Sequence, residues 1–98
     1  MGVFVIVERV AVHDPEPFQR YLREVSPTIE SRGGRYHVVS TDVEVLEGEW
    51  HPGSLVIFEF PTREAALDWW GSDDYAPLKA LRRASATFNI VLAPGLSG

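Results

Sequence analysis

The stretch that decides the fold is Val3–Val12, with the sequence VFVIVERVAV. It is a run of apolar, mostly β-branched residues interrupted only by Glu8 and Arg9, which is typical of a strand buried on both faces. Side chains alternate between the two faces of a strand. Val3, Val5 and Val7 would point to one face, and Phe4, Ile6 and Val10 to the other. Both faces of the sheet that contains this strand therefore need a cover.

A helix is predicted to follow this strand. Asp14 and Pro15 form a typical helix start, with a capping carboxylate followed by proline at the first helical position. The apolar stripe of this helix consists of Phe18, Tyr21, Leu22, Val25 and Ile29. Pro27 predicts a kink or a restart near Ser26, and Gly33-Gly34 ends the helix.

The rest of the chain continues the alternation of strands and helices. The expected elements are a second strand at Arg35–Ser40 that Val43–Glu47 continues after a bend, a third strand at Ser54–Phe60, a second helix from Thr62 to Gly71, a further helical stretch from Ser72, and a last strand at Phe88–Ala93. A loop carrying Trp50 and His51 joins the second and third strands, and a short tail begins at about residue 94. The 98 residues allow one domain, residues 1–98.

This order predicts an α+β fold of the ferredoxin-like type, βαββαβ, with an antiparallel sheet and both helices on one of its faces. The third strand is also apolar on both faces, because Leu55 and Ile57 alternate with Val56, Phe58 and Phe60. Helices on one side cannot cover the other side, and a large exposed apolar patch marks an interface. We therefore expect a homodimer in which two sheets face each other.

Composition excludes several classes of function. The net charge is −5, which is unsuited to binding nucleic acid, and the absence of cysteine excludes disulfides, thiol nucleophiles and zinc–thiolate sites. No Gly-x-Ser-x-Gly elbow, phosphate-binding loop or dinucleotide fingerprint occurs. The apolar opening is broken by Glu8-Arg9 and lacks a basic leader, so we expect no signal peptide or membrane span and a cytoplasmic protein.

Several segments, in order along nearly the whole chain, resemble a bacterial family. They are Gly33-Gly34-Arg35-Tyr36, Glu44-Val45-Leu46-Glu47-Gly48, Ile57-Phe58-Glu59-Phe60-Pro61, Ala65-Ala66 and Ser72 to Tyr75. The chain is similar to domain-of-unknown-function family 1330, within the dimeric α/β-barrel superfamily. The resemblance implies the fold and a dimer, and superfamily relatives include cofactor-independent monooxygenases, haem-degrading enzymes and muconolactone isomerases. An arginine that the family often has before the third strand is absent, because Ser54 follows Gly53 here.

The candidate catalytic residues are Glu59 and His37. Glu59 interrupts an apolar strand, where burial would raise the pKa of a carboxyl and suit it to proton transfer. The alternatives are a carboxylate paired with an arginine such as Arg9, Arg35 or Arg82, or one that is solvated at an edge of the sheet. His37 lies in the second strand, and histidine can act as an acid or a base at physiological pH, although a structural histidine would look the same. Glu8 is a weaker candidate, and the strand register decides whether it lies near Glu59.

The candidate ligand-binding residues are aromatic, with one cation: Tyr36, Trp69, Trp70, Tyr75 and Arg82. They could line an apolar cavity between the helices and the sheet, with Arg82 meeting an anionic group. The three histidines show no recognised metal-ligand spacing, so we expect neither a metal nor a cofactor. The sequence predicts a cofactor-independent enzyme, monooxygenase- or isomerase-like, that acts on a small hydrophobic molecule. The alternative is a non-catalytic dimeric module that binds a ligand or simply assembles.

Overall fold

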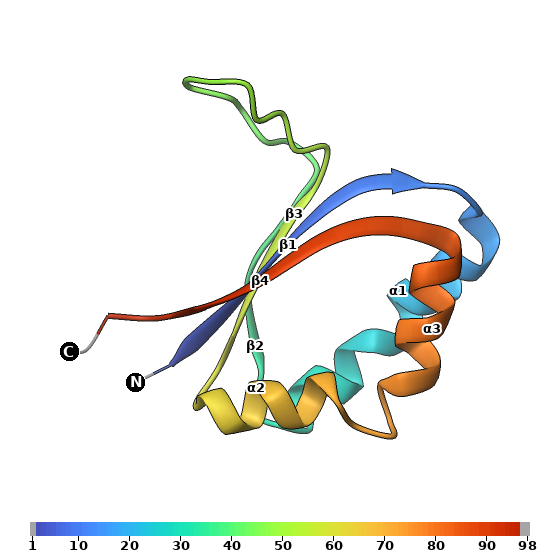
Figure 1. The fold of residues 1–98 in the computed structure, drawn as a ribbon, viewed down its shortest axis with the longest axis vertical. Helices are drawn as coiled ribbons and strands as arrows, with labels where there is room; N and C mark the ends of the chain where they lie inside the picture. The colour runs from blue at the N-terminus through green and yellow to red at the C-terminus, as the bar shows by residue number, and fades with distance from the viewer. Residues whose placement is uncertain (1, 97–98) are drawn as a thin grey trace.

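The structure, a computed structural model, describes residues 2–96. Its elements in chain order are β1 (Val3–Val12), α1 (Pro15–Glu30), β2 (Arg35–Ser40), β3 (Leu55–Phe60), α2 (Arg63–Trp70), α3 (Ala76–Ser85) and β4 (Ala86–Pro94). The strands form one sheet in the order β2-β3-β1-β4, and every neighbouring pair is antiparallel. The helices lie on one side of this sheet (Figure 1). The predicted ferredoxin-like fold is confirmed, with a third helix between α2 and β4.

The core lies between the helices and the inner face of the sheet, which is the face that the helices cover. Val5 and Phe58 pair across β1 and β3, and both are buried. The stripe of α1 supplies Phe18, Tyr21, Val25 and Ile29 to the same core. Each such apolar side chain contributes about 1.5–3 kcal/mol by leaving water. This face of the sheet therefore holds the domain together.

The outer face of the sheet, opposite the helices, is also apolar. The register places Phe4, Ile6, Leu55, Ile57 and Val91 on it. Most of these side chains are half-buried, and Val91 is 57% exposed. In a single chain this face is open, as the sequence of β1 indicates.

The second strand ends earlier than the sequence predicts. Val43–Glu47 does not continue β2, because residues 41–54 leave the sheet and extend beyond its end as a long loop (Figure 1). Ser40 pairs with Leu55, the first residue of β3. A longer β2 would need β3 to begin earlier, at Pro52 and Gly53, and proline has no N–H for a ladder.

Helix α1 also differs from its prediction in detail. It runs without a restart from Pro15 to Glu30 and contains Pro27 within it. Asp14 occupies the N-cap position, but its side chain makes no capping hydrogen bond. Helix α2 begins as predicted, since the Thr62 side chain accepts a hydrogen bond from the Ala65 N–H at 3.1 Å.

The two ends of the described chain lie together at one end of the sheet. The Gly95 N–H donates to the Gly2 carbonyl at 2.9 Å, just beyond the pairing of β1 with β4. Gly95 also approaches the ring of Phe4 closely, and a Cβ there would clash with both neighbours. Glycine at this position is therefore required by the close approach of the two chain ends.

Candidate functional site

A space lined by many aromatic residues lies between α1, the segment around Tyr75 and the inner face of the sheet. This aromatic cavity has a volume of about 360 Å³. Its lining is Val7, Tyr21, Leu22, Val25, Ser26, Ile29, Tyr36, Val39, Val56, Phe58, Trp69, Tyr75, Phe88 and Ile90. Leu22 and Val39 are exposed and mark its mouth, whereas Tyr75 is fully buried. A concave apolar space with few polar groups is typical of a site for a small molecule.

Two pairs of hydroxyl groups are the main polar features of the aromatic cavity. The hydroxyls of Tyr21 and Tyr75 lie 2.9 Å apart, and those of Ser26 and Tyr36 lie 3.0 Å apart. The Trp69 indole is occupied elsewhere, because it donates to Thr28 Oγ1 at 3.0 Å. Each hydroxyl pair uses one of its two protons internally, so one proton remains for a ligand.

Burial disfavours the ionised, phenolate forms of Tyr21 and Tyr36. Burial raises the pKa of Tyr21 well above its ordinary value, and the neighbouring Tyr75 adds to this rise. Burial also raises the pKa of Tyr36, although the hydrogen bond with Ser26 opposes the rise. The hydroxyls of the aromatic cavity are therefore hydrogen-bond donors at neutral pH, and they do not act as bases.

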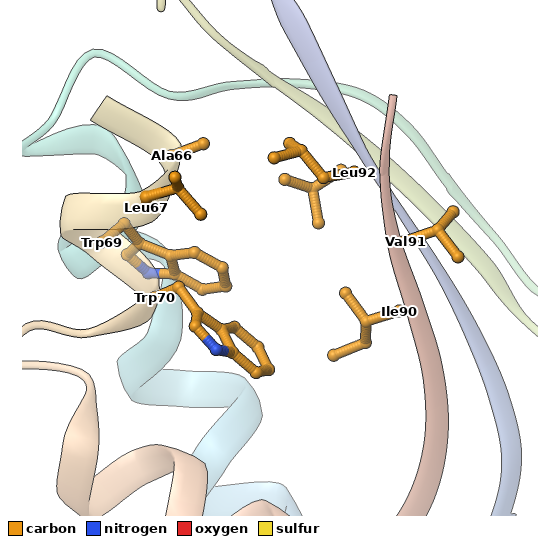
Figure 2. A pocket seen from close by; sticks show the side chains of 8 residues that line it. Ala66, Leu67, Trp69, Trp70, Ile90, Val91 and Leu92 are labelled. Atoms are coloured by element: carbon orange, nitrogen blue, oxygen red, sulfur yellow. The ribbon is translucent and has the colours of Figure 1, made fainter. Parts of the chain in front are cut away.

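A smaller pocket of about 170 Å³ lies between α2 and the C-terminal strand. Figure 2 shows the rings of Trp69 and Trp70 facing Ile90 and Leu92, while Val91 points to the other side of β4. Trp69 lines both this pocket and the aromatic cavity, whereas Trp70 lines only this pocket of the two. The two adjacent tryptophans thus contact different spaces.

Arg82 lies in a third space, the arginine pocket, of about 370 Å³. Its lining is Trp70, Arg82, Arg83, Ala86, Thr87, Phe88 and Ile90. The guanidinium of Arg82 lies 4.8 Å from the centre of the Phe88 ring. The predicted ligand-binding residues are therefore spread over neighbouring spaces: Tyr36, Trp69 and Tyr75 around the aromatic cavity, and Trp70 and Arg82 beside it.

Glu59 and His37 lie together on the outer face of the sheet. His37 Nε2 is 2.8 Å from Glu59 Oε1, and the Arg35 guanidinium is 3.4 Å from the same oxygen. His37 is on the same side as Arg35, as regular alternation predicts, and a bulge in β2 between Tyr36 and Val38 reverses the alternation beyond His37. Regular alternation would place Val39 on this side as well, but Val39 pairs with Val56 after the bulge and lines the aromatic cavity.

The expected rise in the pKa of Glu59 is also wrong. The hydrogen bond from His37 lowers the pKa of Glu59, and Arg35 adds to the lowering. Partial burial opposes both effects. Glu59 is therefore an ionised partner of two basic side chains. The sheet separates it from the aromatic cavity, so a catalytic role for Glu59 and His37, which stays a prediction, would concern a ligand on the outer face.

Glu8 is on the same face as Glu59 but at the other end of the sheet. Glu59 pairs with Phe4, and Glu8 lies four positions further along β1. At about 3.3 Å per residue the two are roughly 13 Å apart. Glu8 accepts hydrogen bonds from the Trp50 indole and the Asn89 amide, each at 3.0 Å. The two carboxylates do not form a catalytic pair in one chain.

Sequence reasoning missed Tyr21 and Ser26 as lining residues of the cavity. Tyr21 was counted only as part of the apolar stripe of α1. The available signal was its hydroxyl, because a buried tyrosine oxygen needs a partner. The same reasoning applies to the part-buried hydroxyl of Ser26, five residues later in α1.

A family model described as "Domain of unknown function (DUF1330)" matches residues 2–96, nearly the whole chain. The chain belongs to the DUF1330 family. Among the curated proteins, no match to this DUF1330 chain was found.

Several solved structures share the fold of this DUF1330 chain. A protein of unknown function from Rhodopseudomonas palustris is 16% identical, with a TM-score of 0.81 over 99% of this chain and 84% of that one. SnoaB, a cofactor-independent oxygenase from Streptomyces nogalater, is 13% identical, with a TM-score of 0.66 over 99% and 95%. A dimeric ferredoxin-like protein of unknown function from Jannaschia sp. CCS1 is 10% identical, with a TM-score of 0.71 over 97% and 100%. These similarities establish the fold.

Residues 2–96 contain neither a helix suited to cross a membrane nor a cluster of metal-binding side chains. Within that range no helix has the length and apolar character to cross a membrane. The same range contains no group of three or more histidine, aspartate or glutamate side chains arranged to hold a metal ion.

Proposed function

We propose that this protein binds a small, mostly apolar molecule in the aromatic cavity and transforms it as a cofactor-independent enzyme of the monooxygenase or isomerase type. The observation that carries the proposal is the cavity itself. It offers about 360 Å³, apolar walls and a mouth at exposed residues, with hydroxyl pairs as its polar groups. The similarity to SnoaB supports the enzyme class at the level of the fold.

The tyrosine hydroxyls suit the stabilisation of an oxygen atom that gains negative charge. Tyr21 and Tyr75 share one proton between them and can donate the other to a ligand. Donors fixed in a dry cavity favour an enolate or phenolate form of a bound ketone or phenol. Such a carbanion, whose proton passes to solvent water, can react with O₂ directly: a CH₂ group becomes a carbonyl, and the second oxygen atom leaves as hydroxide, which combines with the released proton to form water. This balance needs no external reductant.

A second copy of the chain is the proposed partner, bound through the outer face of the sheet. That face carries Phe4, Ile6, Leu55, Ile57 and Val91, with polar groups at both of its ends. The fold is shared with a protein described as dimeric. The aromatic cavity lies on the opposite face of the sheet, so each subunit of the homodimer would retain its own cavity.

The second candidate function is a non-catalytic dimeric module that binds a ligand or assembles. It is favoured by the absence of carboxylate and imidazole groups from the lining of the aromatic cavity, as far as residues 2–96 show. Glu59 and His37 are hydrogen-bonded to each other on the other face. In this case the ligand would be held and released unchanged.

Binding is tested with 1-naphthol, a two-ring phenol, by the quenching of tryptophan fluorescence. Val25→Phe places a ring in the aromatic cavity and should weaken binding at least tenfold. Val45→Phe is the matched control, because Val45 lies in the loop and lines none of the three spaces described. Equal affinity of Val25→Phe and wild-type protein would contradict the proposed site.

Turnover is tested by oxygen uptake and product analysis with polycyclic phenols and ketones, using metal-free protein. Tyr21→Phe should reduce kcat more than it changes KM, because the lost donor acts on the charged form of the substrate. Glu59→Gln and His37→Ala test the roles predicted for those residues, and full activity would remove them. Tight binding without any turnover would support the second candidate.

A further inference from the structure

Arg82 is a buried cation for which the described residues provide no anion. It is 4% exposed, and its Nε is shielded from solvent without a hydrogen-bond partner. None of the salt bridges within residues 2–96 includes it. A buried charge without a partner is costly, and buried arginine is normally paired with a carboxylate or phosphate. The fold therefore maintains a positive charge at a place where no protein group neutralises it.

The surroundings of Arg82 provide only partial compensation. Arg82 is in the last turn of α3, where the helix dipole supplies about half a negative charge at most. The Phe88 ring adds a weak cation–π contact at 4.8 Å. Two more cations, Arg83 and Lys79, are on the same helix, which carries no acidic residue. Positive charge in this region therefore exceeds what the chain compensates.

The pKa of Lys79 is lowered in these surroundings. Desolvation is the main cause that lowers the pKa of Lys79, and repulsion from Arg83 and Arg82 lowers it further. Its ammonium group already donates to the Trp70 carbonyl at 2.8 Å and lies 4.3 Å from the centre of the Trp70 ring. Arg83 is exposed to solvent. Arg82 is thus the one cation of the three that is buried and lacks a partner.

We infer that the ligand of this protein is an apolar carboxylate whose head group pairs with Arg82 in the arginine pocket. A planar carboxylate fits a guanidinium group through two parallel hydrogen bonds, and its single negative charge matches the single unpaired cation. The inference rests on the proposed function for the apolar part of the ligand. Phe88 and Ile90 line both the arginine pocket and the aromatic cavity, so the two spaces are adjacent.

Three tryptophans serve as reporters of the test, through the indole N–H signals of ¹⁵N-labelled protein. Trp69 lines the aromatic cavity and Trp70 the arginine pocket. Trp50, bonded to Glu8 next to the outer face, is the internal control. The probes are 1-naphthol, 1-naphthoate and 1-naphthyl phosphate, which share one ring system and differ in the head group. We expect 1-naphthoate to shift the signal of Trp70 and to bind at least tenfold more tightly than 1-naphthol.

Arg82→Gln should remove this advantage, with a loss of about ten- to hundredfold in 1-naphthoate affinity, while 1-naphthol binding stays within about threefold. Arg63→Gln, an exposed arginine on α2, is the matched control. If Arg82→Gln does not fold, Arg82→Lys provides the readout, because it keeps the charge and loses the paired geometry, so 1-naphthoate should bind more weakly.

Two results would overturn the inference while the proposed function stands: 1-naphthoate binding no more tightly than 1-naphthol, or its advantage persisting in Arg82→Gln. Tighter binding of 1-naphthyl phosphate than of 1-naphthoate would show that the head group is a phosphate and refute the carboxylate. If no probe moves the signal of Trp69 or Trp70, both the inference and the proposed function fail.

Discussion

At the scale of single residues, the carboxylate of Glu59 is held by two basic partners on the outer face of the sheet. His37 is its nearer neighbour at 2.8 Å and the main cause of its lowered pKa, with Arg35 at 3.4 Å. A carboxyl whose pKa is lower in the folded than in the unfolded protein stabilises the fold above its unfolded pKa. That stabilisation is lost as the pH falls through the folded pKa.

The first prediction follows from this sign. Glu59→Gln should lower the urea midpoint of unfolding at pH 7, and the difference from wild type should shrink from about pH 5 downward, as the wild-type carboxyl takes up its proton. Glu47→Gln, in the exposed loop, is the control and should show no such trend. A difference of the same size at pH 7 and pH 3 would show that the ion pair does not stabilise the fold.

Some site residues are visible in the sequence and others are not, for a physical reason. Tyr36, Trp69 and Tyr75 stand out because large aromatic side chains in a small domain must lie between its layers. Tyr21 has the same spacing as an ordinary core residue, and a cavity forms where neighbouring side chains fail to fill space. Arg82 looks like a solvated charge, and its burial depends on how α3 meets β4.

At the scale of elements, local signals place strands and helices well where a glycine, proline or capping residue marks their ends. β1 has the predicted bounds, and β3 ends before Pro61 as expected. No residue type marks the bulge in β2. Regular alternation of side chains would place Val39 on the same face as His37, but the extra residue of the bulge moves Val39 to the inner face. The end of β2 depends on where its partner strand begins, which is a long-range effect.

The second prediction concerns the start of α2. Thr62→Ala removes the side-chain acceptor for the Ala65 N–H and should lower the free energy of unfolding by about 1 kcal/mol. Urea denaturation followed by circular dichroism measures this loss. Thr62→Ser should restore most of the stability, and Thr41→Ala in the exposed loop should change little. An equal loss in Thr62→Ser and Thr62→Ala would show that the hydroxyl is not the cause.

At the scale of the whole molecule, the sheet has two apolar faces and the chain covers one of them. Three helices cover the inner face, as Figure 1 shows. The outer face exposes apolar side chains such as Val91 on β4. This imbalance can be derived from the alternation in β1 and β3, and it is the reason to expect a second copy.

The third prediction tests this assembly. Wild-type protein at micromolar concentration should sediment as a species of about 22 kDa, twice the 11.0 kDa of one chain. Val91→Glu places a charge on the outer face, opposite Ile6 on the edge strand β4, and should shift the population to single chains. Leu22→Glu adds the same charge on the helical side and should leave the assembly intact. A wild-type protein that sediments as stable single chains would refute the homodimer.

The hydrogen bond between Gly95 and Gly2 has a practical consequence for engineering. Since these two backbones touch, a short peptide linker could join them, and new chain ends could be opened within residues 41–54, which belong to no strand or helix. Such a circular permutant would keep every strand pairing of the sheet. It would also place an affinity tag or a fluorescent label on the projecting loop, at the opposite end of the sheet from the crowded glycine contact.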